Sequence, residues 1–166
     1  MEPLHNSYIL DFVVPDGPTG PVGPSNFLET QIYTTYNTSN TSGMLSIRNS
    51  LILPNNSNVF RESGSYIYID EIGYYEFTVS GYLAESTNSN NTSLILKTSM
   101  QNEAATNNLI TIRLNNRKSE SYFSYTRIGK YGSLQKVSLI LNKANNSDAH
   151  ISEVNLTIKK MPWAYN

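Results

Sequence analysis

The sequence predicts an all-β fold, a sandwich or barrel of about ten short strands. Apolar and polar residues alternate with a period of two, most clearly in 74–83. There Tyr75, Phe77 and Val79 share one face and Glu76 lies on the other. Polar turns rich in Asn and Ser separate such stretches at near-even spacing, and no segment has a convincing helical period with caps. This combination is typical of a β-sandwich or barrel.

The expected strands follow one another from residue 28 to residue 160. In order, they are 28–36, 45–53, a short piece at 59–60, 66–70, 74–83, 93–99, 109–115, 122–128, 135–142 and 153–160. The Asn and Ser residues between them hydrogen-bond their own backbone in turns, and Asn tolerates a positive φ. Only the segment 101–107 offers a turn of helix.

One face of each strand is expected to fill the core. The predicted core residues are Tyr75, Phe77, Val79, Ile110, Ile112, Leu114, Val137, Leu139, Leu156 and Ile158. Twelve Tyr against one Trp and five Phe is a marked excess of Tyr. Because Tyr joins an apolar ring to a hydroxyl that needs a partner, it suits a half-buried surface between subunits.

Four tyrosines, Tyr66, Tyr68, Tyr74 and Tyr82, are the strongest interface signal. In the run from Tyr74, even-numbered positions oppose the core face, where a monomer would prefer charged groups. Tyr74 and Tyr82 are therefore the predicted residues of a trimer interface. The alternative is that each Tyr serves only as a β-former on an outer sheet face.

Two segments precede the strands. Residues 1–16 form a leader with one short apolar stretch, and residues 17–25 are three Gly-Pro-X triplets, GPTGPVGPS. Glycine at every third position is the requirement of a collagen triple helix, whose axis admits only hydrogen. A stiff Pro/Gly linker is the alternative, because three triplets alone do not hold a triple helix. The expected organisation is a 1–16 leader or anchor, a 17–25 collagen-like stub and a 26–166 head.

Composition excludes several classes of partner. A net charge of −1 provides no bulk attraction to nucleic acid or anionic lipid, and the longest apolar run is too short to span a membrane. The chain has no Cys, hence no disulfide framework and no thiolate metal site. Charge is uneven, since residues 1–96 carry two basic and nine acidic side chains and residues 97–166 carry ten and four. Either the second half binds a partner or the fold interleaves early and late strands.

No catalytic constellation is recognisable, so the chain is not expected to be an enzyme and no cofactor is expected. His5 and His150 are the only histidines, and neither has the neighbours of a triad or a metal site. The acidic pair Asp70-Glu71 lies beside a turn and is interpreted as a solvated corner. No catalytic, cofactor-binding or metal-binding residue is therefore predicted.

The whole pattern resembles the BclA-like collagen-like glycoproteins of the bacterial spore surface, the exosporium. The residues that carry the resemblance are GPTGPVGPS, the central Gly73-Tyr74-Tyr75-Glu76-Phe77 string after YIYIDEI, and the closing 154–160 strand. Such proteins end in a jelly-roll head of the TNF and complement-head type. The resemblance thus implies a TNF-like jelly roll that assembles as a homotrimer. Their stalks are usually long, and the three triplets here imply a head held close to its anchor.

The function implied by the resemblance is that of a structural protein of the spore outer layer. Its partners would be two further copies of itself and, through the N-terminal segment, other spore-surface proteins. No secretory signal is recognisable, which fits synthesis in the mother cell. One alternative is a carbohydrate- or receptor-binding head in which Asn-rich loops beside Tyr or Trp163 hold a host glycan or receptor. The other is the tip of a trimeric phage fibre.

Overall fold

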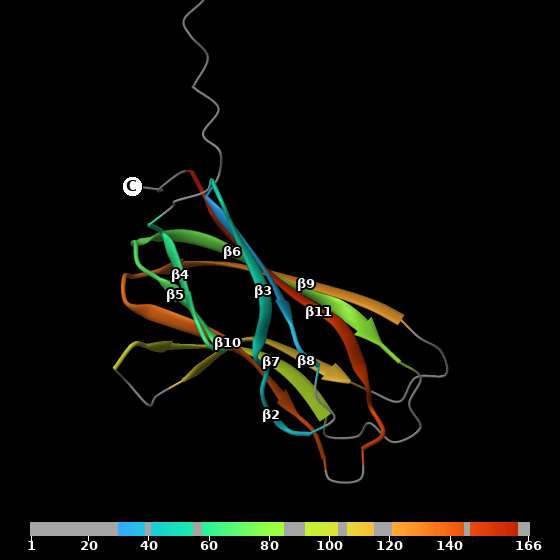
Figure 1. Cartoon of the computed structure of the whole chain (residues 1–166). Coiled ribbons are helices and arrows are strands. Elements are labelled where there is room, and N and C mark those ends of the chain that lie inside the picture. The colour runs from blue at the N-terminus through green and yellow to red at the C-terminus, as the bar shows by residue number, and fades with distance from the viewer. Residues whose placement is uncertain are drawn as a thin grey trace, which may run out of the picture.

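The described part of the chain is a sandwich of two antiparallel sheets (Figure 1). In this computed structural model the structure describes residues 30–38, 41–54, 58–84, 92–102, 106–114, 121–144 and 147–162. The predicted leader at 1–16, the collagen-like stub at 17–25 and Trp163 lie outside these residues. Every element of the described chain is a strand, which confirms the predicted all-β class.

Eleven strands build the two layers. The first sheet has the order β3 (Ile47–Leu53), β1 (Gln31–Tyr36), β11 (Ile151–Lys160), β6 (Gly73–Leu83) and β9 (Ser121–Tyr131). The second has the order β4 (Phe60–Ser63), β5 (Tyr66–Ile69), β10 (Gln135–Asn142), β7 (Thr92–Met100) and β8 (Asn107–Leu114), with β2 (Gly43–Met44) paired to β10. We call them the five-stranded and the six-stranded sheet.

The strand predicted over 45–53 is β3, and the chain just before it passes from one sheet to the other. β2 pairs with β10 of the six-stranded sheet, whereas β3 pairs with β1 of the five-stranded sheet. Between them Leu45 is buried, and its N–H donates to the carbonyl of Leu139 at 2.8 Å. The chain crosses the core here, which a period of two cannot reveal. In 101–107, the only segment whose sequence offers a turn of helix, the described residues 101–102 form a turn and Asn107 begins β8.

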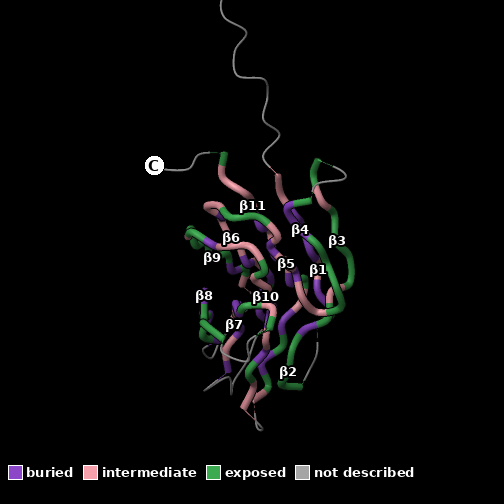
Figure 2. The backbone as a smooth tube through the Cα atoms, turned by 90° about the vertical axis from the view of Figure 1, so that its left-hand side faces the viewer, coloured by how far each residue is buried: buried purple, intermediate pink, exposed green. Residues whose placement is uncertain are grey.

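The inner faces of the two sheets form one apolar core. All ten residues predicted for it are buried, with exposed fractions of 8% or less. Burial alternates along the inner strands, as the striped tubes of β5, β6, β7 and β11 show (Figure 2). The edge strand β9 is exposed on both sides over residues 124–128, because no strand pairs with its outer edge in the described chain.

An aromatic cluster joins the two sheets at one end of the core. Phe60 of β4 packs edge-on against Tyr75 of β6, with ring centroids 5.8 Å apart. Tyr131 of β9 packs edge-on against Phe77 at 4.8 Å and against Tyr75 at 6.4 Å. The Tyr75 hydroxyl donates to the carbonyl of Glu71 at 2.7 Å. Edge-to-face aromatic pairs of this kind stabilise beyond the area that they bury, so the cluster fastens β4 to β6 and β9.

Glycine makes room for the aromatic rings on β9. An added Cβ at Gly81 would lie 2.9 Å from the Phe123 ring and 3.2 Å from the carbonyl oxygen of Ser152. Gly81 and Phe123 are direct partners across β6 and β9. The ring therefore occupies the space that any other residue at 81 would need.

Interleaved strands bring the acidic and basic halves of the sequence together. β11 lies between β1 and β6, and β10 lies between β5 and β7. The Lys160 ammonium pairs with the Glu71 carboxylate, which joins the two halves. Arg61 pairs with Asp70 at 3.3 Å. Asp70 and Glu71 thus lie at a solvent-exposed corner, as expected, and each is also ion-paired.

Gly81→Ala should lower the free energy of unfolding by about 1–3 kcal/mol, because the added methyl overpacks against Phe123. Gly132→Ala is the matched control, since an added Cβ there has no atom within 4 Å. Gly132→Ala should change stability by no more than about 0.5 kcal/mol. Urea denaturation of the two variants measures the difference. Equal stability of the two variants would show that the Phe123 ring moves aside without a cost in stability.

Stability should fall above about pH 10, the ordinary pKa of Tyr. Burial raises the pKa of the Tyr75 hydroxyl, and the nearby Glu71 and Asp70 carboxylates raise it further. Burial and Glu62 likewise raise the pKa of Tyr36. The unfolded chain then loses these protons while the folded chain keeps them, so the stability present below pH 10 is lost as the pH rises.

Tyr75→Phe isolates one of these groups. It should reduce the alkaline slope of the unfolding free energy by about 1.4 kcal/mol per pH unit. At neutral pH it should cost about 0.5–1.5 kcal/mol through the lost hydrogen bond. Urea titrations across the alkaline range test both effects. An unchanged slope would show that the Tyr75 proton is not linked to folding.

Candidate functional site: the open sheet face

The outer side of the five-stranded sheet, which we call the open face, gathers exposed apolar side chains. Six of the eleven large apolar or aromatic side chains exposed by the described chain lie there. They are Tyr33 (42%), Leu51 (54%), Leu53 (36%), Tyr82 (41%), Tyr122 (59%) and Ile128 (56%). Several exposed apolar side chains on one face of a sheet are typical of an interaction site.

Strand register places the apolar groups at the two sides of the open face. One row across the sheet runs Leu51, Tyr33, Thr157, Thr78 and Thr126. The hydroxyls of Thr78 and Thr126 are 2.9 Å apart and share a hydrogen bond. The side chains at the centre of this row are therefore short and bear hydroxyl groups. The side chain at its β3 end, Leu51, is apolar.

The neighbouring row has charges at its centre. It runs Leu53, Gln31, Lys159, Glu76 and Ile128. Lys159 and Glu76 stand directly opposite each other on β11 and β6, where opposite charges stabilise the strand pair. In this row apolar side chains occupy both outer strands, Leu53 on β3 and Ile128 on β9, so here a polar centre lies between two apolar flanks.

The predicted interface residues Tyr74 and Tyr82 both lie on the open face. Tyr82 is 41% exposed and packs edge-on against Tyr122, its cross-strand partner, with ring centroids 5.3 Å apart. Tyr74 is half-buried at the other end of β6, opposite Lys130 of β9. Of the two, Tyr82 with Tyr122 presents the larger free aromatic surface.

Tyr66 and Tyr68 do not share this surface. Both project from β5, which belongs to the six-stranded sheet, and their rings are 6.3 Å apart. The Arg61 guanidinium lies 4.3 Å from the centroid of the Tyr68 ring. The four tyrosines that the sequence suggests as one cluster are therefore split between two sheets.

Most of the open face was missed by reasoning from the sequence. Leu51, Leu53 and Tyr122 lie on strands that were expected, but period-two alternation marks only one apolar face. The signal that could have found them is an apolar run on both faces, as in Leu51-Ile52-Leu53. Ile52 points to the core side and its two neighbours point outward.

One end of the open face is hollowed beside an irregularity in β11. The register of β11 against β6 shifts between Ser152 and Asn155, and Glu153 has a φ of 51°. The hollow is about 590 Å³, and its lining includes Arg48, Glu153 and Asn155. Its opposite charges and open shape suit contact with polar groups of another protein surface better than a small ligand.

The described residues contain no group of three His, Asp or Glu side chains that could hold a metal ion. They also include no helix long and apolar enough to cross a membrane. His150 is exposed in the segment before β11, where its carbonyl accepts a hydrogen bond from Ala84 N–H at 2.9 Å. The raised pKa values of Tyr36, Tyr75 and Tyr131 come first from burial of their hydroxyls.

Comparison with known proteins supports the fold. No protein-family model and no curated protein matches the chain. Crystal structures of murine APRIL at pH 5.0, pH 8.0 and pH 8.5 are similar to it, each with a TM-score of 0.59. Sequence identities are 9%, 10% and 12%, and each match covers 80% of this chain and 99% of the APRIL chain. At this identity the likeness shows the fold alone: the chain has a TNF-like jelly roll.

Proposed function

We propose that the chain is the structural head of a bacterial spore-surface protein that assembles as a homotrimer. The observation that carries the proposal is the open face, whose apolar flanks remain in water in a single copy. Burial of apolar surface stabilises by about 25 cal/mol per Å². Packing three copies around a threefold axis covers this surface by contacts between different patches of neighbouring copies.

A threefold axis fits the rest of the sequence better than a twofold axis. The Gly-Pro-X triplets of 17–25 can form a triple helix only when three chains are held next to one another. A trimeric head raises the local concentration of three such segments. Residue 30 enters the body beside the end of β11, where the Lys160 N–H donates to the Thr30 carbonyl at 2.7 Å. Three tethers would therefore leave the trimer from equivalent positions.

The location and partners in this proposal come from the resemblance to BclA-like proteins. Residues 1–16 would anchor the head to other proteins of the exosporium, and 17–25 would be a short spacer. The head, 26–166, would be displayed close to the spore surface. Its mechanism is assembly, so it requires no cofactor and no catalytic group.

Ile128→Glu should break the assembly, because it places a carboxylate on the apolar β9 flank of the open face. The unaltered chain should sediment at about three times its 18.6 kDa mass, and Ile128→Glu should sediment as a monomer. Ile72→Glu is the matched control, since Ile72 is 66% exposed at the turn before β6 and off the open face. Analytical ultracentrifugation measures all three. A monomeric unaltered chain, or a trimer that survives Ile128→Glu, would contradict the proposal.

Tyr82→Ala should shift the trimer toward monomers by removing one ring of the Tyr82–Tyr122 pair. Truncation of an interface Tyr often costs about 2 kcal/mol or more, which is roughly a thirtyfold change in the association constant. Sedimentation over a dilution series gives that constant. Association as strong as that of the unaltered chain would remove Tyr82 from the interface.

A further inference from the structure

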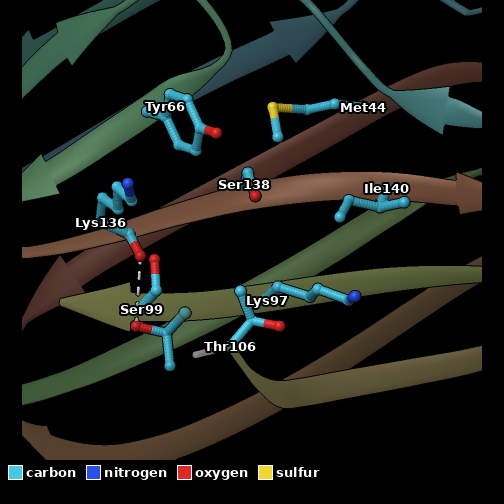
Figure 3. A pocket seen from close by; sticks show the side chains of 9 residues that line it. Met44, Tyr66, Lys97, Ser99, Thr106, Lys136, Ser138 and Ile140 are labelled. Atoms are coloured by element: carbon cyan, nitrogen blue, oxygen red, sulfur yellow. Dashed lines mark hydrogen bonds between the residues drawn. The ribbon is translucent and has the colours of Figure 1, made fainter. Parts of the chain in front are cut away.

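The outer side of the six-stranded sheet, opposite to the open face, carries a small pocket. It has a volume of about 190 Å³, and side chains of β2, β5, β7 and β10 line it. This is the liquid volume of about six water molecules, room for one ring-sized molecule. Figure 3 shows Ser138 in the middle, between Tyr66 and Met44 on one side and Ser99 and Lys97 on the other.

The pocket has a polar floor and apolar walls. Ser138, Ser99 and Thr98 are 5%, 8% and 5% exposed, and their neighbouring backbones are fixed by the β7–β10 ladder. Hydroxyls held in place in this way can donate to and accept from a bound polar molecule. The Tyr66 ring and the side chain of Met44 form walls against which C–H groups can pack.

Two ammonium groups give the pocket a positive charge. Lys97 and Lys136 both line it. Arg113 lies on the same face of the sheet, because it pairs with Ser93, which shares a face of β7 with Lys97 four residues further on. The Lys136 ammonium lies 5.0 Å from the centroid of the Tyr66 ring and donates to the carbonyl of Gln101 at 3.2 Å. An ammonium has three donors, so Lys136 keeps donors for a ligand.

No acidic side chain of the described chain neutralises this charge. Glu62 accepts from Ser50, Asp70 pairs with Arg61, and Glu71 pairs with Lys160. The remaining described acids, Glu76, Asp148 and Glu153, lie in the five-stranded sheet or in the segment before β11. None of these acids lines the pocket. Two lysines that have no acidic partner among the described residues, over a floor of hydroxyls, are typical of a site that receives an anion bearing hydroxyl groups.

We propose that this pocket binds a single acidic sugar residue through its carboxylate, its hydroxyls and one apolar ring face. Lys136 binds the carboxylate, and Lys97, whose ammonium points toward the opposite side of the pocket (Figure 3), adds positive charge there. Ser138 and Ser99 exchange hydrogen bonds with ring hydroxyls, and Tyr66 packs against the C–H face of the ring. An inorganic anion would contact only the lysines. A neutral sugar would leave the lysines without an anionic partner. The combination of all three features selects an acidic sugar.

The test is a titration of the intact chain with three probes. Amide chemical shifts and calorimetry measure the binding of each probe. Methyl β-glucuronide should bind and shift the amides of Ser99 and Ser138. Methyl β-glucoside, which lacks the carboxylate, and acetate, which lacks the ring, should each bind at least about tenfold more weakly. No shift with the glucuronide, or equal binding of either of the other probes, would overturn the proposal.

Variants link the binding to the pocket. The double substitution Lys97→Gln and Lys136→Gln should weaken glucuronide binding about tenfold or more. Lys130→Gln removes the same kind of charge from β9 in the other sheet and should leave binding unchanged. Tyr66→Ala should weaken binding of the glucuronide and not of acetate. Equal loss in Lys130→Gln, or full binding by the double variant, would refute the site.

This test is independent of trimer formation. The pocket lies on the six-stranded sheet, and the proposed trimer uses the five-stranded sheet. Glucuronide binding by the monomeric Ile128→Glu variant would support the pocket even if the homotrimer proposal failed. Loss of binding in that variant, with its fold intact by circular dichroism, would place the ligand at a subunit boundary and overturn this assignment.

Discussion

The packing of aromatic rings between the two sheets is the contact on which the remaining architecture depends. Phe60, Tyr75, Phe77 and Tyr131 come from both layers and meet edge-on at one end of the core. They set the separation of the sheets and orient the edge strand β9, whose outer surface belongs to the open face. Gly129 leaves room for the Tyr131 ring, since an added Cβ there would lie 2.9 Å from it. A distortion of this cluster would therefore move the surface that is proposed to contact other copies.

The two outer faces of the sandwich have different chemistry, which allows them different tasks. The five-stranded sheet presents Leu, Ile and Tyr at both flanks of a polar centre. The six-stranded sheet presents Lys97 and Lys136 at a pocket and Arg113 farther along the same face. A subunit contact on the first would leave the second accessible in every copy. A trimer would then carry three identical pockets, and a weak affinity for one sugar would become a stronger attachment to a surface bearing many.

Much of the fold can be predicted from the sequence, because a buried inner face imposes alternation on every core strand. Ile112, Val137 and Ile158 are examples, since each is apolar between more polar neighbours and each is buried. The crossing at Leu45 could not be predicted, because alternation does not say which sheet a strand joins. Nor could the pocket, whose lining residues Met44, Tyr66 and Lys136 are brought together only by strand pairing. The alternation of apolar and polar residues predicts which side chains are buried. The order of the strands in the sheets determines which exposed side chains lie together.

The position of β1 determines how the head would carry a mechanical load. β1 is paired on both sides, to β3 and to β11, and the chain enters it at residue 30 beside the end of β11. Antiparallel hydrogen bonds run perpendicular to the strands. A pull on the chain at Thr30 along the strand axis would shear both ladders at once, so that many hydrogen bonds share the force. A sandwich attached in this way resists detachment far better than one peeled open from an edge strand, one bond after another.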